Sequence, residues 1–168
     1  MFPSNKEELE RVRKACRSMV TKRAVVSAGA ALVPIPGTDI AADMGLLLDL
    51  IPRINRRFGL APDQIDQLDA QTKVLIYKII KSVGGRLAGQ VITEQIILKV
   101  LGKVGTRMAT KQIVKLVPLA GQVASVLLGL AAMMYVGNSH VDECYEIVKR
   151  IIQDRASPSD YSGGPATN

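Results

Sequence analysis

The amino-acid sequence predicts an all-α protein, a helical bundle built from two apolar helical hairpins plus amphipathic helices. Hydrophobic residues make up 48% of the chain, yet aromatic residues make up only 4% and tryptophan is absent. This mixture of Ala, Val, Ile, Leu and Gly suits closely packed helices better than a β-sandwich. The mean hydropathy is positive although 22% of the residues are charged. Apolar and charged residues therefore occupy separate blocks of the chain.

The length of 168 residues is enough for one domain with its own core. We expect a single helical domain over residues 1–155 and a disordered C-terminal tail over residues 156–168, which are rich in Ser, Pro and Gly. The polar N-terminus lacks the apolar core of a signal peptide. Cys16 and Cys144 are far apart and form no CxxC motif, so free thiols in a reducing compartment are expected.

The first expected element is a basic amphipathic helix. A capping box from Ser4 to Glu7 opens it, and it runs to about Arg23. Apolar side chains from Leu9 to Val20 share one side, and the six Lys or Arg residues from Arg11 to Arg23 make the helix cationic. Two interpretations stand side by side: a helix packed on the core, or a helix that lies on a membrane surface.

The first apolar hairpin is expected around a break in the chain. Residues 24–33 form an apolar run of mostly small residues, which Pro34, Pro36 and Gly37 must interrupt. Thr38 or Asp39 is expected to cap the next helix, which runs to about Phe58, and Asp39 is the preferred cap. Asp43 lies one turn further on and is expected to pair with a basic residue or to line the polar side. The chain lacks further ligands around these two acids, so catalysis is not expected of them.

The middle of the chain predicts three shorter helices. A short polar helix begins at Pro62, and a second helix spans about residues 72–83. Gly84 and Gly85 interrupt the pattern, and a third helix is expected over residues 86–101. Gly102 and Gly105 are expected to mark a turn before a basic segment at residues 106–115.

The second hairpin is expected around a long uncharged run. Residues 116–141 carry no formal charge with His140 taken as neutral, and the mean hydropathy of residues 116–134 is roughly 1.9, above the usual transmembrane threshold. This run is either a membrane-embedded helix or a fully buried core helix. Residues 116–121 echo residues 32–37, which suggests two related hairpins. A last amphipathic helix, capped near Ser139, is expected to run to about Asp154.

Small residues recur every four positions at two places. Gly121, Ser125 and Gly129 would form one stripe of a helix, and Gly85 and Gly89 repeat the spacing. Such stripes let a second helix approach closely, in membranes and in soluble bundles alike.

His140, Asp142 and Cys144 form the only grouping that suggests a metal site. His140 and Cys144 are four residues apart and could point the same way, but two ligands do not make a zinc site. A cap at Ser139 with a buried Cys144 is the preferred interpretation, and the three residues are kept as candidates for an interaction. Motifs for phosphate, dinucleotide or hydrolase sites are absent from the sequence. We therefore expect no enzyme activity, no metal and no cofactor.

The net charge of +7 favours an anionic partner. Stacking aromatics and nucleic-acid-binding motifs are lacking, so an anionic membrane surface is favoured over nucleic acid. A basic surface that is merely solvated is the remaining alternative.

Residues 24–60 resemble the YcjF-like bacterial family, known as domain of unknown function 697. The resemblance rests on the small-residue run, on the Pro-x-Pro-Gly-x-Asp break at residues 34–39, and on the basic segment that ends at Phe58 and Gly59. Residues 117–122 and 137–140 fit the second half of the family more loosely. The resemblance implies a helical, membrane-associated module that is often found next to GTPase domains. This chain carries no such domain, so a GTPase partner would be a separate protein.

Together these patterns predict a non-enzymatic module at the cytoplasmic side of the bacterial inner membrane, acting as an anchor, scaffold or partner-binding protein. The expected partners are anionic membrane lipid and a protein, with homo-oligomerisation open. The alternatives are a soluble cytoplasmic all-α interaction domain and a pore-forming or membrane-disrupting effector.

Overall fold

The computed structural model describes residues 2–30, 38–110 and 121–156, with side chains described for residues 2–26, 44–104 and 129–156. Its elements are the helices α1 (Lys6–Ala30), α2 (Thr38–Phe58), α3 (Pro62–Asp66), α4 (Ala70–Val83), α5 (Glu94–Thr110) and α6 (Gly121–Ala156). The prediction of an all-α bundle is confirmed.

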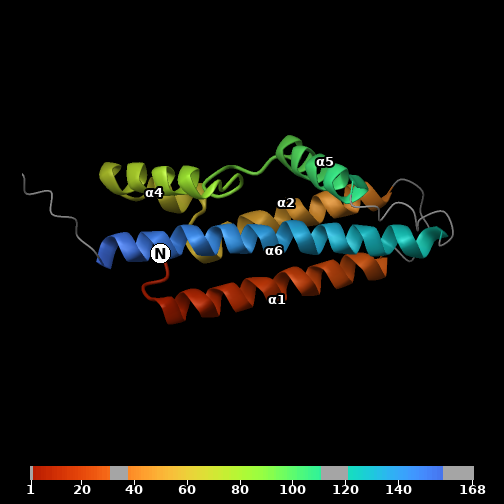
Figure 1. Ribbon diagram of the computed structural model, residues 1–168, viewed down its shortest axis with the longest axis horizontal. Helices are drawn as coiled ribbons and strands as arrows, with labels where there is room; N and C mark the ends of the chain where they lie inside the picture. The colour runs from red at the N-terminus through yellow and green to blue at the C-terminus, as the bar shows by residue number, and fades with distance from the viewer. Residues whose placement is uncertain (1, 31–37, 111–120, 157–168) are drawn as a thin grey trace, which may run out of the picture.

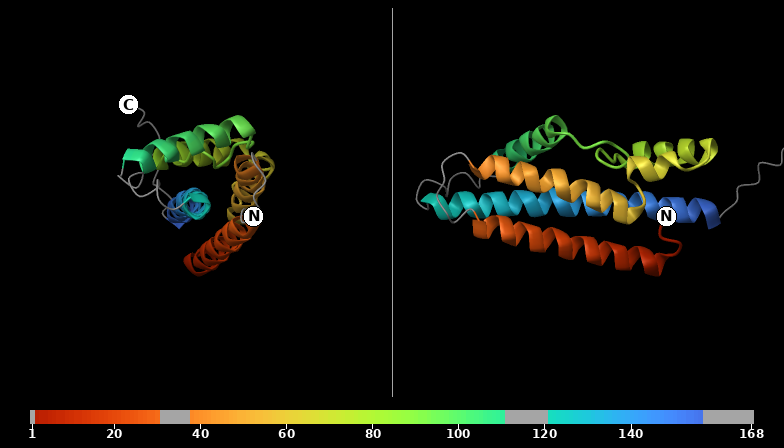
Figure 2. Two further views of the ribbon diagram at one scale, coloured as in Figure 1. Left: turned by 90° about the vertical axis from the view of Figure 1, so that its right-hand side faces the viewer. Right: turned by 180° about the vertical axis from the view of Figure 1, so that it is seen from behind.

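The helix α6 forms the axis of the molecule. Its 36 residues correspond to a rod of roughly 54 Å, and α1 and α2 pack along it. The helices α4 and α5 follow one another in a further layer that covers α2 and α6 on the side away from α1 (Figures 1 and 2). We call these two helices and the linker between them the α4–α5 layer.

Four helix ends gather at one end of the long axis. There α1 ends, α2 begins, α5 ends and α6 begins (Figure 1). Within each expected hairpin the two helices therefore run antiparallel. The segments that join them, residues 31–37 and 111–120, lie outside the described residues, as does the C-terminal tail.

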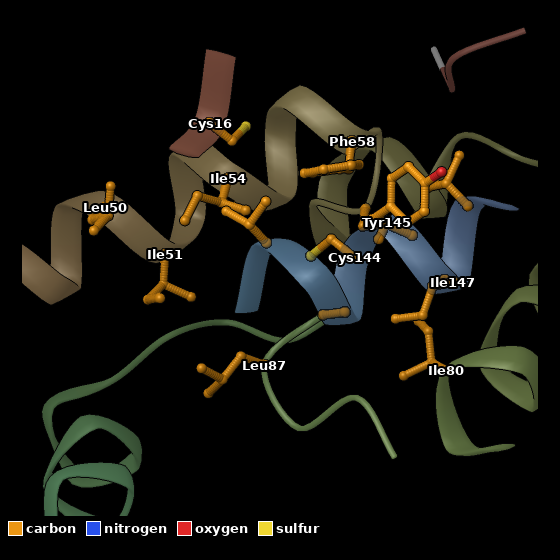
Figure 3. Packing of buried hydrophobic residues seen from close by; sticks show 14 of the residues in the cluster. Cys16, Leu50, Ile51, Ile54, Phe58, Ile80, Leu87, Cys144, Tyr145 and Ile147 are labelled. Carbon is orange, nitrogen blue, oxygen red and sulfur yellow. The ribbon is translucent and has the colours of Figure 1, made fainter. Parts of the chain in front are cut away.

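The core lies where α1, α2 and α6 meet. Phe58 and the aliphatic side chains of α2 face the α6 residues around Cys144, and α1 closes the third side through Cys16 (Figure 3). The α4–α5 layer adds buried residues of its own, such as Ile80 and Leu87. The fully buried side chains at the centre are Cys16, Val20, Leu47, Leu50, Ile51, Ile54, Phe58, Cys144, Ile147 and Val148.

Several helix boundaries agree with the sequence. The helix α3 begins at Pro62 as predicted, and α4 ends before Gly84, whose positive φ of 80° closes it in the left-handed region. Gly59, with a φ of 76°, ends α2 in the same way. Asp69 caps α4 by accepting a hydrogen bond from the backbone N–H of Thr72 at 2.9 Å.

The N-terminus of α1 differs from the prediction by one residue. The side chain of Asn5, not of Ser4, accepts the N–H of Glu8 at 2.9 Å, and the carboxylate of Glu8 accepts the N–H of Ser4 at 2.8 Å. Asn is at least as good an N-cap as Ser. The helix then continues beyond Arg23 to Ala30.

Two other predicted boundaries are wrong. Residues 86–93 are not helical, and α5 begins only at Glu94. Gly102 and Gly105 make no turn, because α5 continues through both.

The predicted cap at Ser139 is also wrong, since α6 passes through Ser139 without interruption. The uncharged run and the final amphipathic segment thus belong to one helix. In the described parts of the chain, no helix combines the length and the apolarity that a membrane crossing requires. Residues 116–120 of the uncharged run lie outside those parts.

Candidate functional site

Three buried polar side chains meet between α2 and α6. His140 Nε2 lies 2.8 Å from Asn55 Oδ1, and Cys144 Sγ lies 3.6 Å from the same oxygen and 3.5 Å from His140 Nε2. Asn55 and His140 are 1% and 2% exposed. The structure thus brings together two of the three predicted interaction residues and adds Asn55, which the sequence did not single out.

The hydrogen bonds of Asn55 settle how the cluster is oriented. Its amide Nδ2 donates to the carbonyl oxygen of Leu87 at 2.8 Å, so Oδ1 is the acceptor and His140 Nε2 is the donor. His140 Nδ1 then faces Glu143 Oε2 at 3.8 Å. Through Leu87, the cluster also holds the linker between α4 and α5 against α2.

The cluster joins α2, α6 and the linker after α4 through hydrogen bonds, and its thiol is not activated as a nucleophile. Burial raises the pKa of the Cys144 thiol well above its ordinary value, and Glu143 and Cys16 raise it further. Burial also raises the pKa of Cys16 to about 11, against a lowering effect of Arg57. Protonated, buried thiols are inert. Within the described residues, no three side chains of the His, Cys, Asp or Glu types are placed so that they could hold a metal ion.

Asp142, the third predicted interaction residue, lies apart from this cluster. It accepts hydrogen bonds from Arg13 at 2.9 Å and from Arg17 at 2.8 Å, both on α1. Tyr145, one turn further along, donates to Glu10 at 2.6 Å, and the Arg13 guanidinium lies 4.5 Å from the centre of its ring. Asp142 therefore joins α6 to α1.

The predicted glycine stripes have three different outcomes. Gly85 and Gly89 do not share a helix, since both lie in the linker after α4. A Cβ on Gly85 would meet Ile147 at 3.0 Å, and Gly89, with a φ of 70°, donates its N–H to Leu60 O at 3.0 Å. Both glycines allow close packing, but they do so in the loop after α4 and not between two helices. Gly121 and Ser125 lie on α6 with undescribed surroundings, and Gly129 is half-buried.

A close approach of two helices involves Gly137, a glycine that the predicted stripe did not include. A Cβ on Gly137 of α6 would lie 2.7 and 2.9 Å from the two methyl groups of Val20 in α1, and 3.4 Å from Leu50 in α2. Gly137 follows Gly129 by eight residues, so it continues the same face of the helix by two turns. Extending the four-residue spacing past Met133 would have found it.

The proline break is largely outside the described residues. This applies to Pro34, Pro36 and Gly37. Asp39 and Asp43 lie in the first turns of α2, but their side chains are outside the described set, so their predicted capping and pairing remain predictions.

Charge is distributed unevenly along the long axis. In α1, residues 6–23 hold all the charged residues and residues 24–30 hold none. In α6, residues 121–141 are uncharged and residues 142–156 carry the charges. Both uncharged stretches lie toward the end where the four helix ends gather (Figure 1). We call these two stretches, residues 24–30 of α1 and residues 121–141 of α6, the uncharged end.

The segment from α4 into α5 carries an excess of positive charge in its sequence. Residues 70–103 contain six Lys or Arg residues and one acid, Glu94. Among the side chains that the structure describes, Lys78, Lys81, Arg86 and Lys99 form no ion pair. Five arginines of α1 and α2 have acidic partners, namely Arg13, Arg17, Arg23, Arg53 and Arg56. Other cations of these two helices, such as Arg11, Lys14 and Lys22, form no ion pair within the described residues.

Comparison with known proteins adds no relative: no family model, no curated protein and no solved structure matches the chain.

Proposed function

We propose that the chain is a non-enzymatic, membrane-associated helical module that acts as an anchor, scaffold or partner-binding protein. The observation that carries this proposal is the uncharged end. Two helices bring stretches without any charge to the same end of the long axis, whereas their charged halves lie toward the other end. Sorting of this kind is typical of a protein that meets water and lipid at different places.

Exposed valines support the same proposal. Val25 and Val26 are 58% and 68% exposed, and both belong to the uncharged stretch of α1. Asp39 and Asp43 of α2 and Arg107 of α5 are charged residues on helices that reach this end. A contact in which the end enters only the interfacial region leaves such groups at the level of the lipid head groups.

The resemblance to the YcjF-like family points in the same direction, and membership of that family is part of the proposal. So are a location at the cytoplasmic side of a bacterial inner membrane and a separate protein partner, for which a GTPase is the candidate that the resemblance suggests.

Flotation with lipid vesicles tests the proposal. We expect the purified chain to float with vesicles that contain phosphatidylglycerol, and a fraction to stay bound at high salt, because apolar contact is not screened. Failure to float with either neutral or anionic vesicles would refute membrane association.

A single substitution locates the contact. Val26→Asp places a charge on the uncharged stretch and should weaken vesicle binding at high salt without loss of helicity. Ser18→Asp, at an exposed position two turns earlier on α1, adds the same charge and serves as the matched control. Equal binding by both variants would show that the uncharged end is not the contact.

A further inference from the structure

We infer that the outward face of the α4–α5 layer docks on the head groups of anionic phospholipids. This inference rests on the proposed membrane association and specifies its surface and its lipid chemistry. We call the surface the basic face and define it by Val74, Tyr77, Lys78, Lys81, Leu98 and Lys99.

The α4 part of the basic face is one helix stripe. Val74, Lys78 and Lys81 recur at spacings of four and three residues, and Tyr77 lies beside them, so all four project from the same side. Ile76, Ile79 and Ile80 are buried and occupy the opposite side, toward α6. Val74 is 69% exposed and Tyr77 is 44% exposed, so the stripe faces away from the bundle.

The α5 part continues the face along the molecule. Leu98 is 50% exposed and Lys99 is exposed, whereas Ile97 and Val104 are buried toward α2 and α6. Both helices lie on the same side of α2 and α6 (Figures 1 and 2). The helix α5 then runs on to the uncharged end, on the side of the bundle away from α1 (Figures 1 and 2).

Uncompensated charge indicates an anionic partner. Lys78, Lys81 and Lys99 form no ion pair with the described side chains. Like charges on one face repel each other, and an anionic surface removes that cost. Unpaired cations also occur on α1, but there three acids, Glu7, Glu8 and Glu10, lie among the basic residues, whereas residues 70–103 hold one acid.

The pattern of apolar residues favours lipid over other anionic partners. Val74, Tyr77 and Leu98 stand singly between lysines and form no continuous apolar stripe of the kind that a partner helix would require. Single apolar side chains can enter the interfacial region while lysine stems extend their ammonium groups to the phosphates. Tyrosine is enriched at this level of the bilayer.

Charge reversal with a matched control tests the basic face. One variant carries Lys78→Glu, Lys81→Glu and Lys99→Glu. The control carries Arg11→Glu, Lys14→Glu and Lys22→Glu on α1, at exposed positions that also form no ion pair within the described chain. Both change the net charge equally, and circular dichroism verifies that both fold.

We expect the basic-face variant to bind phosphatidylglycerol vesicles about a hundredfold more weakly than the wild type at low salt, since each lysine near an anionic surface contributes about fivefold. The control should lose much less. Equal losses in both variants would mean that net charge alone acts, and would overturn the inference.

A fluorescent probe reports contact directly, because the chain has no tryptophan of its own. Tyr77→Trp should shift its emission to shorter wavelength on adding phosphatidylglycerol vesicles, whereas Ser18→Trp on α1 should not. A shift at position 18 alone would place α1 on the membrane and overturn the inference.

The two proposals fail in different ways. Wild-type protein that floats equally with neutral and anionic vesicles, and a basic-face variant that floats as well as the wild type, would overturn the basic face but leave membrane association intact. Binding of duplex DNA as tightly as of anionic vesicles, with the same loss in the basic-face variant, would reassign the face to nucleic acid.

Discussion

At the scale of single residues, the close packing of α6 against α1 depends on the absence of a side chain at Gly137. Gly137 lets α6 approach α1 so closely that a Cβ would lie within 3 Å of both methyl groups of Val20. Valine is stiff about its first side-chain torsion and cannot swing away, and Leu50 closes the other side.

Gly137→Ala should therefore destabilise the protein by about 1–3 kcal/mol, the usual cost of overpacking a core. Urea unfolding measures the change. Gly45→Ala is the control, because nothing lies within 4 Å of a Cβ at Gly45 in α2. That change should stabilise the protein by about 0.5–1 kcal/mol, since alanine is the better helix former. A neutral Gly137→Ala would mean that the helices separate without cost.

The buried thiols predict how stability depends on pH. Burial raises the pKa of Cys16 to about 11, so the folded state holds this proton more tightly than the unfolded state. The contribution is complete below the unfolded value of about 8.5 and is lost as the pH rises toward 11. Cys144, through burial, and Tyr145, through its bond to Glu10, also have raised pKa values and act in the same direction.

We expect the free energy of unfolding of the wild type to fall between pH 9 and pH 11, with a shallower fall for Cys16→Ala. Urea titrations at several pH values measure both slopes. The variant retains Cys144 and Tyr145, so its curve should not become flat. An unchanged slope would show that Cys16 ionises as easily in the folded as in the unfolded state.

At the scale of helices, local signals predicted some boundaries and failed at others. The boundaries at Pro62 and Gly84 follow from residue types alone. The unbroken α6 does not follow from residue types. Serine often caps helices, and the sequence does not indicate that the neighbouring His140 forms a hydrogen bond with Asn55, 85 residues earlier in the chain. The non-helical linker likewise depends on Asn55 binding the carbonyl of Leu87, a partner that periodicity cannot indicate.

The N-terminus of α4 provides the prediction at this scale. Asp69 accepts both the backbone N–H and the hydroxyl of Thr72, and these bonds hold the pKa of its carboxyl below the usual value. Asp69→Ala should lower the thermal midpoint, and Asp69→Asn should lower it less, because Asn also caps.

The sign of the pH effect follows from the lowered pKa. The cap stabilises the fold above the unfolded pKa of about 3.9 and is lost as the pH falls through the folded value. The difference between wild type and Asp69→Ala should thus shrink in acid. A constant difference would show that the charge of Asp69 has no part in the cap.

At the scale of the whole molecule, the proposed membrane association depends on two surfaces. The uncharged end combines stretches of α1 and α6 that are far apart in sequence, and the basic face combines α4 with α5. The uncharged run of α6 was visible in the sequence. The unpaired state of Lys78, Lys81 and Lys99 was not, because the sequence does not tell which of the 22 basic residues find acids in the fold.

Cell fractionation measures membrane association in the cell itself. After expression in bacteria, we expect the protein to sediment with the membranes and a fraction to stay there through a high-salt wash, since the uncharged end holds by apolar contact. Recovery of all the protein in the soluble fraction before any wash would refute membrane association. Complete release by salt alone would leave charge as the only contact and would refute the role of the uncharged end.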